Sequence, residues 1–439
     1  MPQPKPDDTF ERAKSAFLDG VQHSEAGRDA AAEACFEASL ALWPARSSTL
    51  FNLGAVRVRL GKFDSALVAL ERALALDAEQ VDAWCQRGIA LAALARGTDA
   101  VASFERALKL DARCAPAVHH LGCTLNELHR HADALAAFER LVKLQPGQAE
   151  AWFRHGQTLQ MLERHAEALP SYEHALAIDS AIPQAWLNRA GILKDSGRAA
   201  EAVAAYRAAL VHGADTEQVQ FHLAALEGGD TPAIAPRAYV QELFDDYAER
   251  FEQHLIGALN YRGHRVLVEM LQRAAAAGRR LQHALDLGCG TGLCGPLLKV
   301  FVTELDGVDL SAQMLAKAQI LGVYRHLVQA DIIEHLQGTD VHHDLVCAAD
   351  VFTYIGDLDA VFGAVQRVLR PGGLFGFSVE AAPDEVDFEL RASLRYAHSR
   401  RHVEALAQRH GYTLLQCAQQ PLREDQRRPI EALYVVLTR

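Results

Sequence analysis

Small and large apolar residues recur with a period of 34 along the first half of the chain. A small residue stands at each repeat position, an alanine follows after twelve residues, and a large apolar side chain follows after four more. The first series is Gly20, Gly54, Gly88, Gly122, Gly156 and Ala190, the second is Ala32, Ala66, Ala100, Ala134, Ala168 and Ala202, and the third is Phe36, Leu70, Phe104, Phe138, Tyr172 and Tyr206. This period predicts stacked helix pairs. We expect the small residues where paired helices cross, and the large side chain in the gap to the neighbouring repeat.

Other residues keep the same phase. Trp84, Trp152 and Trp186 stand four residues before the small position, and glycines such as Gly27 and Gly61 separate the two helices of a pair. These series resemble tetratricopeptide repeats over about residues 10–214. The resemblance implies an all-α solenoid of about six repeats, and we expect residues 215–227 to form an end helix that covers its last apolar face.

A solenoid of this type has a concave groove, and polar residues recur two positions before the small residue. They are Asn52, Gln86, His120, Arg154 and Asn188. This ladder is suited to hydrogen-bonding the backbone of a bound peptide or protein, although residues that are merely solvated would give the same pattern. A clamp for a C-terminal carboxylate is not expected, because repeat two has Phe51 and Ala55 where such clamps have Lys and Asn.

The pattern changes after a turn-rich stretch at 228–236, which we interpret as a linker. Residues 237–277 have the period of amphipathic helices, and from 282 short apolar runs alternate with helical ones. Such alternation predicts an α/β, Rossmann-like sheet that binds ligands at the carboxyl ends of its strands. The predicted organisation is therefore a solenoid with its end helix at 10–227, the linker, and a second domain at 237–439 with a core at 282–439.

A glycine-rich turn follows the first predicted strand of this domain. It contains Asp286, Gly288, Gly290 and Gly292, and glycines at such a turn let the backbone pass close to a ligand. A nicotinamide dinucleotide site is the competing interpretation, but it usually has the pattern GxGxxG. A carboxylate two residues before the first glycine would repel a pyrophosphate and suits the cationic amino group of S-adenosylmethionine.

Further residues at predicted strand ends agree with this interpretation. They are Asp309, placed for ribose hydroxyls, Met314 and Ile332 beside the adenine, Asp331 for the adenine amino group, and Asp350 after the fourth strand. The set resembles the class I S-adenosylmethionine-dependent methyltransferases over roughly residues 240–439. Each of these residues also has a purely structural interpretation. The aspartates could cap the ends of strands, and Met314 could be an ordinary residue of the hydrophobic core.

The segment 243–255 resembles the lid helix that precedes the core in many methyltransferases, and its Tyr247 is expected to cover the cofactor. With Leu422-Arg423-Glu424 and the repeats, the chain resembles a bacterial family of tetratricopeptide-repeat methyltransferases. This resemblance implies methyl transfer and leaves the substrate open.

Methyl transfer from a sulfonium depends mainly on positioning, so no catalytic triad is expected. Tyr354 is the candidate residue facing the acceptor, although it could equally be packing. The run from Asp350 to Ile355 lacks the Asn/Asp-Pro-Pro-Tyr pattern of nitrogen-methylating enzymes of nucleobases or glutamine. The basic stretch at 391–401 either contacts an acidic substrate or is a solvated face.

The 439-residue chain has a formal net charge of -12, which gives a nucleic acid no general electrostatic attraction. Its eight cysteines form no CxxC pair, and no run approaches the roughly 18 apolar residues of a membrane span. We therefore expect a cytoplasmic protein with no membrane partner and no metal site. Three functions remain: a methyltransferase whose repeats recruit a protein or peptide, a small-molecule methyltransferase whose repeats serve assembly, and an inactive S-adenosylmethionine-binding scaffold.

Overall fold

The computed structural model describes residues 6–229, 231–248, 251, 255, 257, 259–275, 280–425 and 428–439. The chain divides into two compact units at Ala214 and Asp215. Each unit has its own buried core.

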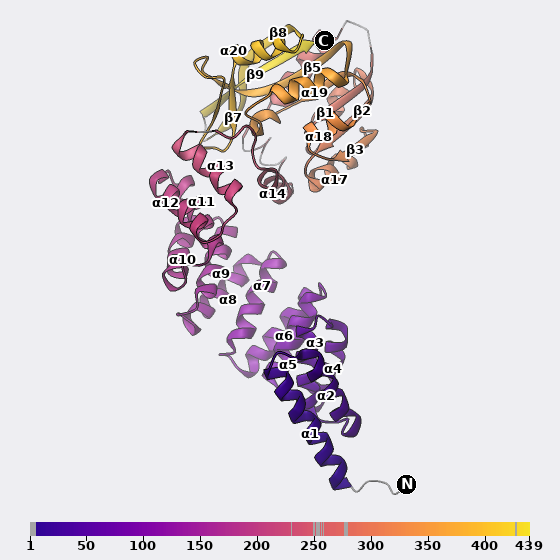
Figure 1. The fold of residues 1–439 in the computed structure, drawn as a ribbon, viewed down its shortest axis with the longest axis vertical. Coiled ribbons are helices and arrows are strands. Elements are labelled where there is room, and N and C mark those ends of the chain that lie inside the picture. Colours follow the sequence, from indigo (N-terminus) through magenta and orange to yellow (C-terminus); the bar gives the residue numbers. More distant parts are fainter. Residues whose placement is uncertain are drawn as a thin grey trace. The chain divides into compact units, whose positions relative to one another are not determined.

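The first unit consists of helices packed in consecutive antiparallel pairs (Figure 1). The helices are α1 (Pro6–Glu25), α2 (Asp29–Leu42), α3 (Ser47–Arg59), α4 (Phe63–Leu76), α5 (Val81–Ala93), α6 (Gly97–Leu110), α7 (Ala115–Glu127), α8 (His131–Leu144), α9 (Ala149–Met161), α10 (His165–Ile178), α11 (Pro183–Asp195) and α12 (Ala199–Val211). The predicted helical solenoid of paired helices is confirmed.

The periodic glycines lie at the helix crossings, as predicted, and their closest neighbour is the large side chain of the same repeat. A Cβ atom on Gly88 would stand 2.5 Å from Cε1 of Phe104, and one on Gly20 would stand 2.6 Å from Cε1 of Phe36. The ring thus packs on the glycine of its own repeat, and Phe104 also stacks on His120 of the next repeat, with ring centroids 6.0 Å apart. The glycine and the ring of one repeat act as one packing unit, in which the missing side chain leaves room for the ring.

The turns between paired helices also follow the period. A residue with positive φ recurs at Gly27, Gly61, Ala95, His129, Glu163 and Gly197. A left-handed residue is a common way to end a helix, and glycine adopts it without strain. In the third repeat this residue is Ala95 and not the nearby Gly97, which instead begins α6.

Helix α13 (Thr216–Glu227) belongs to the second unit, although we expected it to end the solenoid. Its Phe221 is fully buried, with its ring centroid 5.5 Å from that of Tyr239 and 6.2 Å from that of Tyr396. The predicted linker is also packed. Tyr396 donates a hydrogen bond to the carbonyl of Pro232, and the Ala235 amide donates one to the carbonyl of Tyr354.

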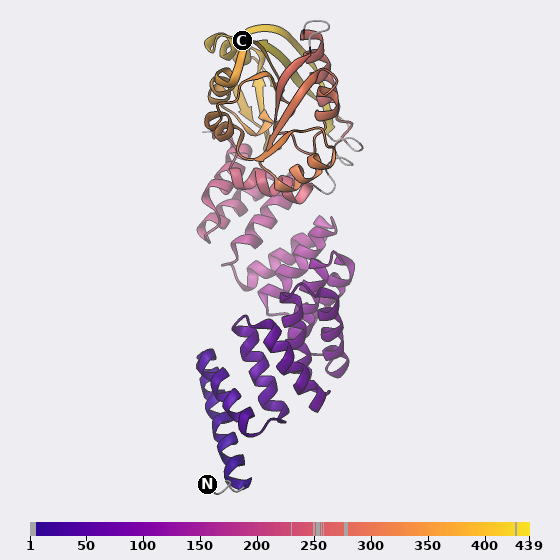
Figure 2. The same ribbon diagram turned by 90° about the vertical axis from the view of Figure 1, so that its right-hand side faces the viewer.

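The core of the second unit is a mostly parallel sheet with strand order β3-β2-β1-β4-β5-β7-β6, in which β9 pairs antiparallel with both β5 and β8 (Figure 2). The strands are β1 (Leu281–Leu287), β2 (Val302–Asp309), β3 (His326–Gln329), β4 (His343–Ala348), β5 (Leu369–Ala382), β6 (Phe388–Leu390), β7 (Tyr396–Ser399), β8 (Thr413–Asp425) and β9 (Arg428–Thr438). Strand order reverses between β1 and β4, where doubly wound sheets bind ligands. The hairpin β6–β7, which the sequence did not predict, pairs with the last residues of β5.

Helices cover both faces of this sheet. One buried cluster joins the strands to α18 (Ile332–Gly338), α19 (Asp359–Val368) and α20 (Arg400–Arg409), and the other joins them to α15 (Gly263–Ala274) and α16 (Gly295–Leu298). The remaining helices are α14 (Arg237–Tyr247), α17 (Ala312–Ile320) and the 3-10 helix η2 (Phe352–Tyr354). Because both faces are covered, β1, β4 and β5 each contain an unbroken run of buried residues, without the alternation of a sheet that is buried on one face.

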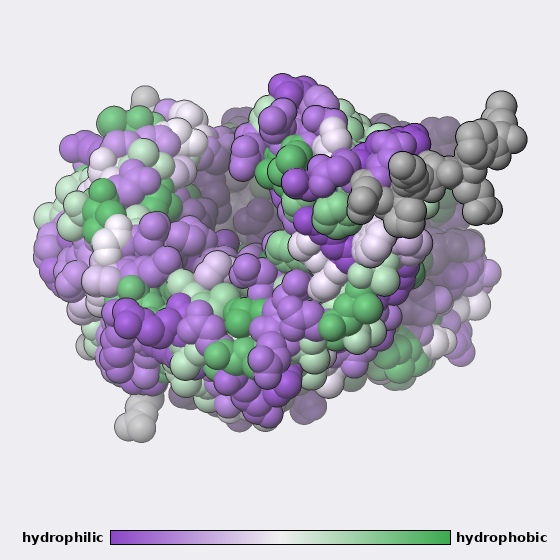
Figure 3. Space-filling view, turned by 90° about the horizontal axis from the view of Figure 1, so that it is seen from below, coloured by the Kyte–Doolittle hydropathy of each residue, from purple (hydrophilic) through white to green (hydrophobic). Residues whose placement is uncertain are grey.

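Most of the surface in Figure 3 is hydrophilic, with hydrophobic residues in small separate groups. Within the described ranges, no helix is both long and apolar enough to cross a membrane.

Candidate functional site

A cavity of about 510 Å³ opens at the carboxyl ends of β1, β2, β3 and β4. Its lining includes the glycine-rich turn and the described cofactor residues that were predicted, except Gly292, where a Cβ atom would stand 2.7 Å from Leu321. The lining also includes residues from α13, α14, η2 and the hairpin β6–β7. The predicted lid helix thus lies over the cavity with α13, which sequence reasoning had assigned to the repeats.

The glycine-rich turn has left-handed backbone at each of its three glycines. A Cβ atom on Gly288 would stand 2.5 Å from Cγ2 of Val351, so that glycine is needed for packing. At Gly290, by contrast, no protein atom lies within 4 Å of where a Cβ would stand. Gly290 lines the cavity, so its bare backbone leaves space for a ligand.

Asp309 holds this turn in place from the end of β2. One carboxylate oxygen accepts a hydrogen bond from the Gly290 amide at 2.8 Å, and the other accepts one from the Ser311 amide at 2.9 Å. The side chain is almost fully buried, and burial raises its pKa. A carboxylate offers about four acceptor positions, so Asp309 retains capacity for two ribose hydroxyls.

Ser311 connects the same turn to the lid helix. Its hydroxyl caps α17 by accepting from the Met314 amide, and it donates to a carboxylate oxygen of Asp245 on α14 at 2.5 Å. The sequence did not identify Asp245 as a contact residue. In the adjacent pair Asp245-Asp246, nothing in the sequence shows which carboxylate bonds to a residue of another element. The contact fixes the lid helix beside the predicted ribose site.

Asp286 lies buried at the end of β1, on the cavity wall. The hydroxyl of Tyr324 donates to it at 2.7 Å. Burial raises the pKa of Asp286 to about 7, although the bond from Tyr324 lowers it. The carboxylate therefore changes charge near neutral pH, and a cationic ligand group would favour its ionised form.

The predicted adenine residues lie together on the same wall. Met314 and Ile332 are buried and line the cavity, and so does Asp331. One oxygen of Asp331 caps α18 by accepting from the amides of Ile333 and Glu334. Asp331 therefore does act as a cap, which the sequence had left open. Its contact with adenine stays a prediction.

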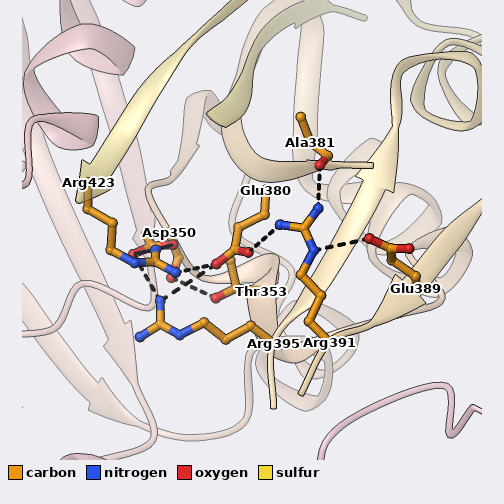
Figure 4. Close-up of polar contacts among 8 residues, drawn as sticks. All are labelled: Asp350, Thr353, Glu380, Ala381, Glu389, Arg391, Arg395 and Arg423. Atoms are coloured by element: carbon orange, nitrogen blue, oxygen red, sulfur yellow. Dashed lines mark hydrogen bonds and ion pairs between the residues drawn. The ribbon is translucent and has the colours of Figure 1, made fainter. Parts of the chain in front are cut away.

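Asp350 also lines the cavity, where it belongs to a buried cluster of charges (Figure 4). It has a φ of 59°, an uncommon conformation for a residue other than glycine, and its amide donates to Ser378. Its carboxylate lies within salt-bridge distance of Arg423 and Arg395. Burial raises the pKa of Asp350 even though both arginines lower it.

Tyr354 is buried and lines the cavity. Its ring packs edge-on against Phe244 of α14, with centroids 5.5 Å apart, and the Arg395 guanidinium lies 5.8 Å from its centroid. Tyr354 thus faces the cavity and also packs, so its role toward the acceptor stays a prediction. The side chain of Tyr247 lies outside the described part of the chain.

The predicted groove residues of the first unit are all half-buried, and most have local partners. Asn52 donates to the carbonyl of Ser48, Arg154 pairs with Glu150, and Asn188 donates to the hydroxyl of Tyr172. His120 stacks on Phe104, and burial lowers its pKa to about 4. Among described residues Gln86 has no side-chain hydrogen bond. A separate recess of about 270 Å³ lies between α7, α8 and α9.

The cavity residues fit S-adenosylmethionine. Gly290 leaves open space, Asp309 retains acceptor capacity, and the hydroxyl oxygen of Thr291 in the same turn is buried with no partner in the described part. An unpaired buried hydroxyl beside an open cavity fits a site that a polar ligand completes. Asp286 would meet the amino group, and Asp309 the ribose.

Two comparisons with known families agree with this geometry. A family model described as a methyltransferase domain matches residues 285–377, and one described as a tetratricopeptide repeat matches 51–116, 121–183 and 155–218.

The similar curated proteins include oxygen methyltransferases. The chain is 33% identical over 147 residues to a malonyl-[acyl-carrier protein] O-methyltransferase of Enterobacter lignolyticus, which covers 32% of this chain and 57% of the relative. It is 34% identical over 173 residues to the protein of the same name from Methylovorus sp., a match that covers 37% of this chain and 56% of the relative. A ubiquinone biosynthesis O-methyltransferase of Pseudomonas syringae is 29% identical, covering 24% and 47%. The chain thus spans about half the length of these relatives.

Similar solved structures include YrrB, described as a tetratricopeptide-repeat protein with an unusual peptide-binding site, at 20% identity and a TM-score of 0.38, covering 42% of this chain and 95% of that one. A crystal structure of MamA protein matches at 22% identity and a TM-score of 0.36, covering 39% and 93%. From the family matches, the chain carries tetratricopeptide repeats followed by a class I methyltransferase domain, and a domain of that class implies use of S-adenosylmethionine.

Proposed function

We propose that this protein is an S-adenosylmethionine-dependent methyltransferase that methylates an oxygen atom of a substrate recruited by its repeats. The observation that supports the proposal most is the meeting of Asp286, Gly290 and Asp309 at one cavity. In this proposal Asp286 binds the amino group and Asp309 the ribose, and the bare backbone of Gly290 leaves room for the ligand beside Asp309.

The chemistry needs little from side chains. The acceptor oxygen displaces the sulfur of the sulfonium in line, so orientation and exclusion of water supply most of the acceleration. Asp309 and Ser311 orient the glycine-rich turn, and α14 covers the cavity with apolar side chains that include Val240, Leu243 and Phe244.

Oxygen is proposed as the acceptor atom on two grounds. The curated relatives are named as O-methyltransferases of a malonyl group on a carrier protein and in ubiquinone biosynthesis. In addition, the residues after β4 lack the Asn/Asp-Pro-Pro-Tyr pattern of nitrogen-methylating enzymes of nucleobases or glutamine. The relatives' names also keep a small-molecule acceptor as the alternative, with repeats that only assemble the enzyme.

The repeats are proposed to bind a protein or peptide that carries the acceptor. Tetratricopeptide repeats suggest such an interaction, and binding there would raise the local concentration of substrate at the cavity, to roughly millimolar for a short flexible connection. Gln86 is the groove residue best placed to meet a partner, since its amide is not engaged elsewhere in the described chain.

The test is methyl transfer from tritiated S-adenosylmethionine onto proteins of a whole-cell extract, followed by kinetics on the labelled acceptor. Asn52→Ala with Gln86→Ala should raise the apparent KM several-fold and leave kcat and cofactor affinity unchanged. These substitutions spare the packing, because Asn52 bonds only its own helix. Glu105→Ala, at an exposed position on α6, is the matched control. Unchanged constants in the double variant would favour the small-molecule alternative.

A further inference from the structure

Three arginines and two carboxylates gather at the edge of the cavity (Figure 4). Asp350 follows β4 and Glu380 lies in β5, while Arg423 comes from β8 and Arg391 and Arg395 come from the hairpin β6–β7. Glu380 is 2% exposed and Arg423 is 7% exposed, so the centre of the cluster is dry.

Two of the arginines donate hydrogen bonds within the cluster. Arg391 donates to Glu380 at 3.0 Å, to Glu389 at 3.1 Å and to the carbonyl of Ala381 at 2.7 Å. Arg423 donates to Glu380 and lies 3.4 Å from the nearer oxygen of Asp350. Each of these two arginines therefore uses at least two of its five N–H donors within the protein.

Arg395 is different. Its nearest carboxylate oxygens are those of Asp350 at 3.8 Å and Glu380 at 4.0 Å, which is too far for hydrogen bonds. Within the described ranges it makes no side-chain hydrogen bond, yet its side chain is only 25% exposed and lines the cavity. Burial lowers the pKa of Arg395, but the nearby Asp350 and Glu380 carboxylates outweigh that effect and raise it. The cluster thus holds a cation in position without using its N–H groups.

The surroundings of Arg395 define what it would meet. Tyr354 lies under the guanidinium, Phe244 packs on Tyr354, and Ile234, Val240 and Leu243 continue the same wall. These residues come from η2, α14 and the predicted linker, whereas Asp286, Gly290 and Asp309 come from the ends of β1 and β2 and the turn between them. A ligand here would meet these apolar side chains next to the Arg395 guanidinium, while the other cavity-lining arginine, Arg237, is paired with Glu334.

We propose that Arg395 determines substrate specificity by binding a carboxylate, and that the methyl acceptor is this carboxylate at the end of an apolar acyl segment. A guanidinium pairs with a carboxylate through two parallel hydrogen bonds, which orients both oxygens. A neutral hydroxyl would use only one of these donors and would not fix the orientation of the acceptor. The inference rests on the proposed function and names its substrate class.

The reaction is balanced without a catalytic base. One carboxylate oxygen donates an electron pair to the methyl carbon, the carbon–sulfur bond breaks, and its electron pair stays on sulfur. The anion and the sulfonium become a neutral methyl ester and S-adenosylhomocysteine, and no proton is released. A hydroxyl acceptor would have to lose a proton to a base, whereas a carboxylate accepts the methyl group without one.

The experiment uses the full chain and N-acetylcysteamine half-thioesters of malonate, succinate and glutarate, each with its terminal amide as the uncharged control. Calorimetry in saturating S-adenosylhomocysteine should detect binding of at least one acid and not of its amide. Arg395→Gln should weaken that binding by at least tenfold, and Arg395→Lys by less. Arg400→Gln, which removes an exposed arginine paired with Glu404, should change nothing.

Two further readouts complete the test. The product formed from an acid that binds and methyl-tritiated S-adenosylmethionine should release labelled methanol in mild alkali, as a methyl ester does. The affinity of Arg395→Gln for S-adenosylhomocysteine should equal that of the wild type. If cofactor affinity falls as much as acid affinity, Arg395 binds the carboxylate of the cosubstrate and the proposal is wrong. Equal binding of acids and amides, or an alkali-stable product, would also overturn it. A chain that binds no S-adenosylhomocysteine would instead refute the proposed function.

Discussion

Asp309 provides the sharpest test of the cofactor site, because one carboxylate both holds the glycine-rich turn and faces the cavity. Asp309→Ala removes the acceptor for the Gly290 and Ser311 amides, at 2.8 and 2.9 Å, and the acceptor expected for two ribose hydroxyls. Hydrogen bonds to a charged group contribute about 1.5–3 kcal/mol each. Since water replaces part of the lost ligand contact, we expect a total loss of about 1.5–3 kcal/mol, or roughly 10- to 150-fold in Kd.

Calorimetric titration of S-adenosylhomocysteine into the full chain measures this loss. Asp306→Ala is the matched control, because Asp306 lies on the same strand and pairs with Arg325 instead of facing the cavity. It should leave affinity unchanged. An Asp309→Ala variant that folds normally and binds with wild-type affinity would refute the ribose assignment.

Three further predictions follow from the same contacts. Gly290→Val should abolish cofactor binding and leave the circular dichroism spectrum unchanged, since the valine side chain enters the cavity. Gly288→Ala should instead destabilise the fold, because its Cβ atom would collide with Val351. Normal cofactor binding by Gly290→Val would refute the close approach of the turn to the cofactor. Affinity for S-adenosylhomocysteine should fall as pH drops below about 7, by up to about tenfold per pH unit, because the Asp286 carboxylate becomes protonated. Tyr324→Phe should move this fall to higher pH, because the hydrogen bond from Tyr324 lowers the pKa of Asp286. A flat affinity profile from pH 8 to 6 would contradict this prediction. Phe221→Ala should destabilise the second unit by about 3–5 kcal/mol and lower its thermal unfolding temperature, and an unchanged melting curve would show that α13 is not part of that core.

The sign of the Asp286 prediction differs between ligand binding and folding. Its pKa in the folded state lies above the usual value, so the protonated form stabilises the ligand-free fold. That stabilisation is complete below pH 3.8 and is lost as pH rises through about 7. Ligand affinity changes in the opposite direction, because the bound amino group favours the carboxylate.

Features with a local period could be predicted from the sequence. The 34-residue spacing located the helix pairs, and the strand-to-turn pattern around Gly288 located the cavity. Both depend on residues close together in the chain.

Features set by distant contacts could not be predicted. Helix α13 follows the repeats directly, yet Phe221 packs on Tyr396, 175 positions later, and no local pattern reports that contact. Likewise the five basic residues of the 391–401 stretch are similar in sequence, but only Arg395 lines the cavity, because the turn of β6–β7 directs it there. Arg400 and Arg401 are exposed and pair with Glu404 and Asp387.

The central claim is that the cavity of the second unit binds S-adenosylmethionine. Equilibrium dialysis of the full chain with tritiated S-adenosylmethionine, with excess unlabelled S-adenosylhomocysteine or NAD as competitor, tests it most directly. We predict saturable binding of about one equivalent that S-adenosylhomocysteine displaces and NAD does not. Binding that NAD displaces, or no saturable binding by a folded chain, would contradict the account.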